Sequence, residues 1–194
     1  NPQGRQSLDE PNFVDLEPRA AGTSGDGYIW KYLYTIKPNQ IIKFDSIDFM
    51  PVPNSWGTGD SVDIKNNAVD GKIETAVILN AGDGYQPIGT TFNNIPILGD
   101  GTGGKVSVTV NSQGKVSDVT VTNGGTGYTS GTVQFYPGAP GTEIGGPIAG
   151  LSAVGVAGTS VADIEVIIPP PGGHGFDVYK ELGAFRVLMY ARFE

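Results

Sequence analysis

The stretch GKIETAVILNAGDGYQPIGTTF, residues 71–92, returns from residue 114 as GKVSDVTVTNGGTGYTSGTVQF, residues 114–135. Each copy contains a Gly-Lys turn, a run rich in β-branched residues, the motif Asn-x-Gly-x-Gly-Tyr, and a second short run that ends in Phe. These runs are too short and too rich in Val, Ile and Thr for helices, and glycines interrupt them. Each copy therefore predicts a strand, a glycine turn and a second strand, which together form a glycine-rich β-hairpin.

Bulky side chains gather on either side of this duplicated unit, where alternation predicts strands at 28–36, 47–52, 163–168 and 184–193. Short helical turns are expected only near 41–44 and 178–182. We predict an all-β fold with a β-sandwich-like framework and a duplicated glycine-rich β-hairpin module. The expected organisation is an extended arm at 1–25, a β framework from 26–56 and 162–194, and the repeat module at 57–161.

The composition argues against several classes of partner. The chain has 12 basic and 20 acidic residues and a net charge of −8, which opposes binding to a nucleic-acid backbone. No run approaches the roughly 20 apolar residues of a membrane span, and the absence of Cys removes disulfides and thiolate chemistry. Because the chain opens at Asn1 without Met and ends just after the apolar run FRVLMYARF, we expect a fragment of a larger protein.

Two glycine-rich features look like ligand motifs but have simpler explanations. The stretch GDGTGGKV at 99–106 fits phosphate-binding patterns, yet Val106 replaces the Ser or Thr that would hold magnesium. An alternating VSVTV run follows, so we expect a turn before a strand. Four Asp-Gly pairs are typical of hairpin turns, and none has the ligand spacing of an EF-hand. We therefore expect neither a metal site nor a cofactor.

A catalytic site is not expected either. His174 is the single histidine and lies between glycines in GGHG, and no G-x-S-x-G nucleophile elbow is present. The weakest of three functional hypotheses is a hydrolase that uses His174 with Asp163 or Asp177. We assign no catalytic residue and predict that the protein is not an enzyme.

Tyr85 and Tyr128 close the repeated motif and have two interpretations. Each ring can pack across its own glycine turn, which explains why the same residue occurs in both copies. Alternatively, the two tyrosines, with Asn80 and Asn123, form contacts to a glycan in a carbohydrate-binding or adhesin module. We favour packing, and the glycan contacts remain the alternative.

Two segments carry a family resemblance. The stretch GDGYIWKYLYTIKP at 25–38, together with PVP at 51–53, resembles the baseplate wedge protein of contractile-tailed bacteriophages known as gene product eight. The stretch at 172–194 looks like its continuation in versions from phages of marine cyanobacteria. The NGGTGY repeats resemble modules found in many phage tail and surface proteins, but they are not recognisable in the best-known family member.

The resemblance implies a mainly β, non-catalytic wedge subunit of the virion tail baseplate that is assembled in the host cytoplasm. It also implies a homodimer that bridges other baseplate wedge proteins. From their size and rigidity we expect the rings of the aromatic strand to supply packing or interface contacts. These candidates are Tyr28, Trp30, Tyr32 and Tyr34.

Overall fold

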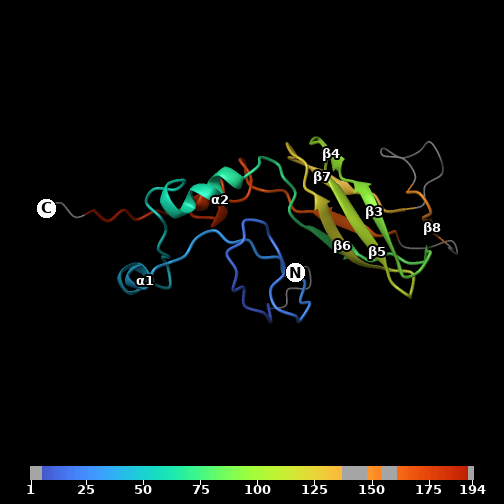
Figure 1. Cartoon of the computed structure of the whole chain (residues 1–194), viewed down its shortest axis with the longest axis horizontal. Helices are drawn as coiled ribbons and strands as arrows, with labels where there is room; N and C mark the ends of the chain where they lie inside the picture. Colours follow the sequence, from blue (N-terminus) through green and yellow to red (C-terminus); the bar gives the residue numbers. More distant parts are fainter. Residues whose placement is uncertain (1–5, 137–147, 154–160, 192–194) are drawn as a thin grey trace.

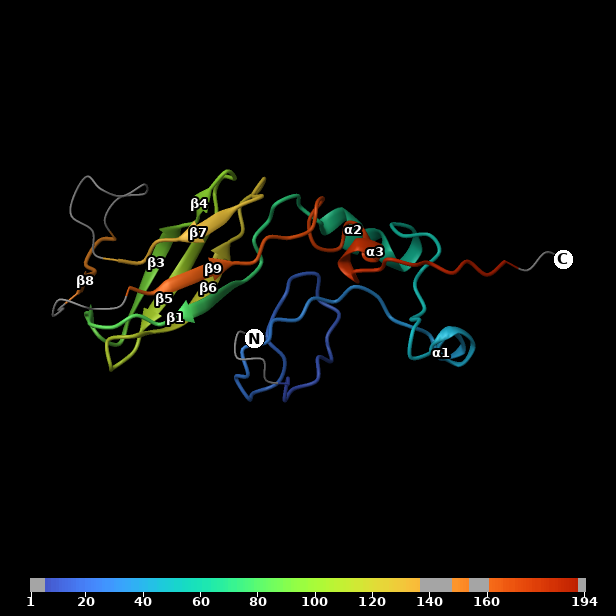
Figure 2. The same ribbon diagram turned by 180° about the vertical axis from the view of Figure 1, so that it is seen from behind.

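The computed structural model describes residues 6–136, 148–153 and 161–191. The molecule is elongated, with the β-strands packed together at one end and the helices toward the other (Figure 1). The last described residues run outward beyond the helices, away from the strands (Figure 2). The repeats therefore lie at one end of the molecule, and the short helices of the flanking sequences lie toward the other.

The described strands form antiparallel sheets, which confirms the all-β prediction. The first sheet has the order β1 (Ala76–Asn80), β9 (Asp163–Val166), β7 (Gly131–Val133), β4 (Leu98–Gly99). The second has the order β3 (Thr90–Pro96), β5 (Lys105–Val110), β6 (Val116–Asn123). A two-stranded ribbon pairs β2 (Tyr85–Gln86) with β8 (Ser152–Ala153).

The two strands of one repeat do not pair with each other, so the expected hairpin is not formed. In the first copy β1 joins the first sheet and β3 joins the second, and in the second copy β6 and β7 are divided in the opposite way. Strand β5 follows the first copy and lies between β3, the last strand of that copy, and β6, the first strand of the second copy. In the same way β9 follows the second copy and lies between β7, the last strand of that copy, and β1, the first strand of the first copy. The copies are thus interleaved, and each sheet contains one strand from each.

Reciprocal backbone hydrogen bonds join the two copies. The N–H of Ile73 donates to the carbonyl of Gly124 over 3.0 Å, and the equivalent N–H of Val116 donates to the carbonyl of Ala81 over 2.9 Å. Such an exchange between equivalent positions is what an approximate two-fold relation between the sheets produces. The duplication in sequence is therefore a duplication in structure, although the unit is not a hairpin.

The glycine turns have matching conformations in the two copies. Gly84 has φ of 76° and its equivalent Gly127 has φ of 74°, a left-handed conformation that side chains with a Cβ rarely adopt. Gly71 also has positive φ, and a Cβ there would lie 2.1 Å from the backbone nitrogen of Tyr128. Glycine is required at this position both for conformation and for the close approach of the second copy.

The core lies between the two sheets and follows the strand alternation. Along β5, Val106, Val108 and Val110 are fully buried, while the intervening residues face outward. Phe135 meets the ring of Phe92 from the other copy at 5.6 Å between centroids. The sandwich therefore has its own continuous apolar core, built from both repeats and from β9.

A second, smaller packed region is formed by η1 (Gly59–Ser61), α2 (Val62–Asn67) and α3 (Val178–Glu181). Helix α1 (Pro38–Phe44) contains no buried residue. The expected helical turns near 41–44 and 178–182 are therefore present. Ile64 and Val178 are buried in the packed region. The indole N–H of Trp56 donates to the carbonyls of Gly175 and Phe176, each over 3.0 Å, and so ties α2 to the segment before α3.

Three of the four strands predicted outside the repeats are wrong. The strand at 163–168 is present as β9, but 28–36 is extended chain with a single bridge between Trp30 and Arg19, and no strand is assigned at 47–52 or in the described part of 184–193. These segments have strand-like alternation but no neighbouring strand to pair with among the described residues. Of the residues expected to form the framework, only those of β9 lie in a sheet.

The described part of the arm, residues 6–25, is folded back on itself. The carboxylate of Asp26 accepts hydrogen bonds from the Ser7 hydroxyl at 2.7 Å and from the N–H groups of Leu8 at 2.8 Å and Tyr28 at 3.0 Å. The Ser7 hydrogen bond, followed by the Tyr28 and Leu8 backbone bonds, lowers the pKa of Asp26 to about 2. The ends of this loop are thus joined by one side chain.

Candidate functional site

Tyr85 is part of the sandwich core. It is 2 % exposed, and its ring lies 5.1 Å from that of Phe135. Its hydroxyl donates to the carbonyl of Phe135 over 2.8 Å and accepts from the N–H of Ala162 over 2.7 Å. Burial raises the pKa of this hydroxyl, which stays protonated and satisfies two backbone groups at neutral pH.

Tyr128 has the equivalent role in the other copy. It is also 2 % exposed, and its hydroxyl donates to the carbonyl of Ile97 over 3.0 Å and accepts from the N–H of Gly104 over 3.1 Å. A Cβ on Gly125, within the same repeated motif, would lie 2.8 Å from the ring. The packing interpretation therefore describes Tyr128, and neither tyrosine presents its ring to a glycan.

Asn80 and Asn123 shape the repeated turn. The side-chain oxygen of Asn80 accepts from the N–H of Gly82 over 3.0 Å, and that of Asn123 accepts from the N–H of Gly125 over 2.9 Å. This contact to the residue two positions on is the Asx turn, which explains the choice of Asn in both copies. The four residues proposed as glycan contacts thus have matching structural roles.

The aromatic segment holds the chain together internally. Tyr28, Trp30, Tyr32 and Tyr34 are all half-buried, and the Tyr28 and Trp30 rings stack at 5.9 Å. The Tyr34 hydroxyl donates to the carbonyl of Pro51 over 2.9 Å, and burial raises its pKa. These rings therefore supply packing contacts within the chain, one of the two roles expected for them.

A charged network fastens the N-terminal part to the sandwich. Lys31 contacts Glu74 at 2.6 Å, and Lys72 contacts Glu17 at 2.8 Å and Glu74 at 3.9 Å. The hydrogen bond from Lys72 lowers the pKa of Glu17. A cavity beside this network is lined by Glu17, Lys72 and Thr122, among others. Its charged groups already pair with one another, which leaves none directed at a ligand.

His174 does not form a catalytic arrangement with either aspartate considered from the sequence. Its Nδ1 lies 2.5 Å from a carboxylate oxygen of Glu181, the one hydrogen-bond partner of the ring among the described residues. Burial raises the pKa of Glu181, but the hydrogen bond and charge of His174 outweigh it and the net shift is downward. Asp177 instead caps α3 by accepting from the N–H groups of Tyr179 and Lys180. The geometry is that of a structural hydrogen bond between the two side chains.

The described residues contain no group of three or more His, Cys, Asp or Glu side chains placed to hold a metal ion. The GDGTGGKV stretch leads from β4 into β5, so no helix follows its glycines to face a phosphate. Within 6–136, 148–153 and 161–191, no helix has the length and apolar character needed to cross a membrane.

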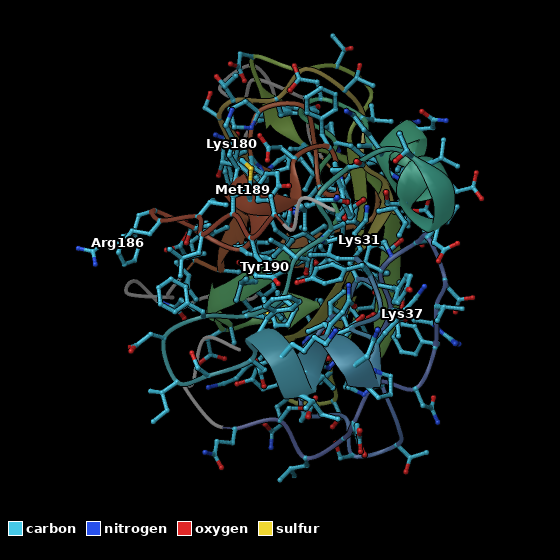
Figure 3. The ribbon with its side chains drawn as sticks, turned by 90° about the vertical axis from the view of Figure 1, so that its left-hand side faces the viewer. Lys31, Lys37, Lys180, Arg186, Met189 and Tyr190 are labelled. Carbon is cyan, nitrogen blue, oxygen red and sulfur yellow. The ribbon has the colours of Figure 1, made fainter. Side chains whose placement is uncertain are left out.

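The surface best suited to binding lies at the end remote from the sandwich, and we call it the apolar end. It consists of α1, the loop after it and the last described segment, and the Phe44 and Tyr190 rings meet there at 5.8 Å. Figure 3 views the molecule from this end, with Met189 and Tyr190 above α1 and Arg186 pointing away. Its exposed large apolar residues are Ile41, Ile42, Phe44, Ile47, Phe49, Met50, Phe185, Val187, Leu188, Met189 and Tyr190.

The charges at the apolar end are balanced. Residues 37–50 and 176–191 together contain four cations and four carboxylates, so the net charge of −8 resides in the rest of the chain. Apolar area with little net charge is typical of a protein contact surface. The sequence analysis looked for contact residues at 28–34. The apolar runs IIKF at 41–44 and FRVLMY at 185–190 are the sequence features that could have indicated the apolar end.

Comparison with protein-family models, with curated protein sequences and with solved structures finds no match to this chain.

Proposed function

We propose that this protein is a structural subunit of a phage tail baseplate wedge that bridges neighbouring baseplate proteins. The observation that carries the proposal is the apolar end, where Ile42 is 86 % exposed and Met189 is 91 % exposed. Large apolar side chains at such exposure are unfavourable in water unless a partner covers them. The family resemblance of residues 25–38 and 172–194 supplies the identity of the assembly.

The division of the molecule supports the same function. The sandwich buries its large side chains in its own core, and the surrounding loops are joined by internal hydrogen bonds and ion pairs. Contact area is concentrated in segments that lie outside that core. A scaffold protein requires this combination of a stable body and adhesive segments, and it requires no reactive side chain.

The proposal places the protein in the virion, at the tail baseplate, after assembly in the host cytoplasm. Its partners are other baseplate wedge proteins and a second copy of the chain. The glycan-binding alternative is less favoured, because the rings of Tyr85 and Tyr128, two of its four proposed contacts, are buried.

The test compares two exposed isoleucines. Ile42 lies on α1 at the apolar end, and Ile88 lies on the sandwich with 48 % exposure. We expect Ile42→Ser to reduce incorporation into purified tails, measured by quantitative mass spectrometry, while Ile88→Ser is incorporated normally. Equal circular dichroism melting curves would show that both variants fold. Absence of the unmodified chain from purified tails, or normal incorporation of Ile42→Ser, would contradict the proposal.

A further inference from the structure

We propose that residues 185–190 add as a strand to the open edge of a β-sheet in a different protein. This inference deepens the proposed function by specifying the form of the contact. It rests on that function only for the expectation that the other protein is a neighbouring wedge subunit.

The backbone of this segment belongs to no helix or strand and is unpaired, with a bend at Phe185. The N–H of Ala184 still donates to the carbonyl of Tyr179 over 2.9 Å, but no backbone hydrogen bond joins residues 185–191 to another described residue. In both views of the ribbon this segment runs outward from α3 (Figures 1 and 2). An extended chain with free donors and acceptors is the form that strand addition requires.

One face of the segment is apolar throughout. In an extended chain Phe185, Val187 and Met189 share that face, and Arg186 shares the other with Leu188 and Tyr190. All five apolar residues are exposed, and Phe185 reaches 90 %. A strand face that is apolar throughout is buried in a folded sheet, against a core or another layer. The acceptor is therefore a sheet edge with an apolar layer beside the face of Phe185, Val187 and Met189.

The chain itself can cover part of the other face. The ring of Tyr190 contacts that of Phe44, the last residue of α1, at 5.8 Å. Ile41 and Ile42 on the same helix are exposed. Helix α1 can thus lie over one face of the added strand, and the partner's layer covers the opposite face.

A second copy of this chain is a poor acceptor. Two paired tails would form only a two-stranded ribbon, which is marginally stable in water. In the described sheets the edge strands β1 and β6 lie beside each other. The backbone hydrogen bonds from Ile73 to Gly124 and from Val116 to Ala81 join their ends, so neither edge is open along its length. The edge strand β3 is bulged, with Asn94 at φ of 61°, and β4 has two residues. Such edges resist pairing, which favours a different protein as the acceptor.

The experiment places the photo-reactive residue p-benzoylphenylalanine at position 185 of the full chain, in the cells that naturally make it. Cross-linked peptides are identified by mass spectrometry. We expect cross-links to an edge strand of another protein. Cross-links confined to a second copy or to the same chain, or none at all, would overturn the inference. If the acceptor is not a baseplate protein, the inference stands and the proposed function fails.

Proline variants test whether backbone pairing is responsible. Leu188→Pro and Met189→Pro each remove one N–H, and neighbouring N–H groups in a strand point to opposite sides. At least one variant should lower the cross-link yield about tenfold or more. The controls Leu188→Val and Met189→Val keep the N–H and a strand-forming side chain. Equal yields for Pro and Val at both positions would overturn the inference, and unchanged melting temperatures would show that folding is intact.

Discussion

Replacement of Tyr85 by Phe tests the interleaved sandwich, because the hydroxyl joins two parts of the chain that are distant in sequence. The ring contact with Phe135 is retained in the variant, so no cavity is formed. The carbonyl of Phe135 and the N–H of Ala162 lose a buried partner. Two lost hydrogen bonds and two unsatisfied buried groups cost about 2–4 kcal/mol of unfolding free energy. For a chain of this length that corresponds to a fall in melting temperature of about 4–16 °C.

The assay is urea denaturation followed by circular dichroism, with two comparisons. Tyr128→Phe removes the equivalent pair of bonds and should lose a similar free energy, within about 1 kcal/mol. Tyr32→Phe is the control, because its hydroxyl bonds only to the exposed hydroxyl of Thr35 among the described residues. We expect it to change the stability by less than about 0.5 kcal/mol. A Tyr85→Phe protein as stable as the control would refute the reasoning.

Three further predictions concern the turns, the smaller packed region and the acid response. Gly127→Ala, where no atom lies within 4 Å of the added Cβ, should cost about 1–2 kcal/mol from its positive φ alone, whereas Gly71→Ala should cost several times more or prevent folding. Urea unfolding measures both, and equal effects would contradict the close approach of the copies. Trp56→Phe should be about 1–2 kcal/mol less stable than Trp30→Phe, because the Trp56 indole donates two hydrogen bonds and the buried Trp30 nitrogen has no partner among the described residues. The reverse order in the same assay would count against the packing described here. Because the pKa of Asp26 falls from 3.8 to about 2 on folding, its contribution to closing the loop is complete above pH 3.8 and is lost as the pH falls toward 2. Amide exchange by NMR should show this opening, which Asp26→Asn should make independent of pH in that window.

The repeat predicted the strands and the glycine turns, because these depend on local chemistry. Asn80 and Gly84 specify the turn within a few residues, and the copies repeat it at Asn123 and Gly127. The sheet to which each strand belongs depends on contacts between copies, and a sequence pattern carries no information about them. For that reason the prediction paired each copy with itself and missed the interleaving.

The flanking segments were less predictable for a related reason. Alternation at 28–36 resembles a strand, yet its residues pack against loops and a charged network in place of a neighbouring strand. Pairing requires a second strand at the right distance, and only the fold determines whether one is there. The aromatic residues, for which packing or interface contacts were expected, supply packing contacts, while the exposed apolar surface lies around α1 and residues 185–190.

The most direct measurement of the proposed function is a cryo-electron microscopy map of tail baseplates purified from the phage that the proposal takes as the source of this chain. We expect density for the interleaved sandwich within each wedge, with the apolar end against a neighbouring subunit and residues 185–190 paired to its sheet edge. Baseplates without this chain, or with its apolar end exposed to solvent, would contradict the account.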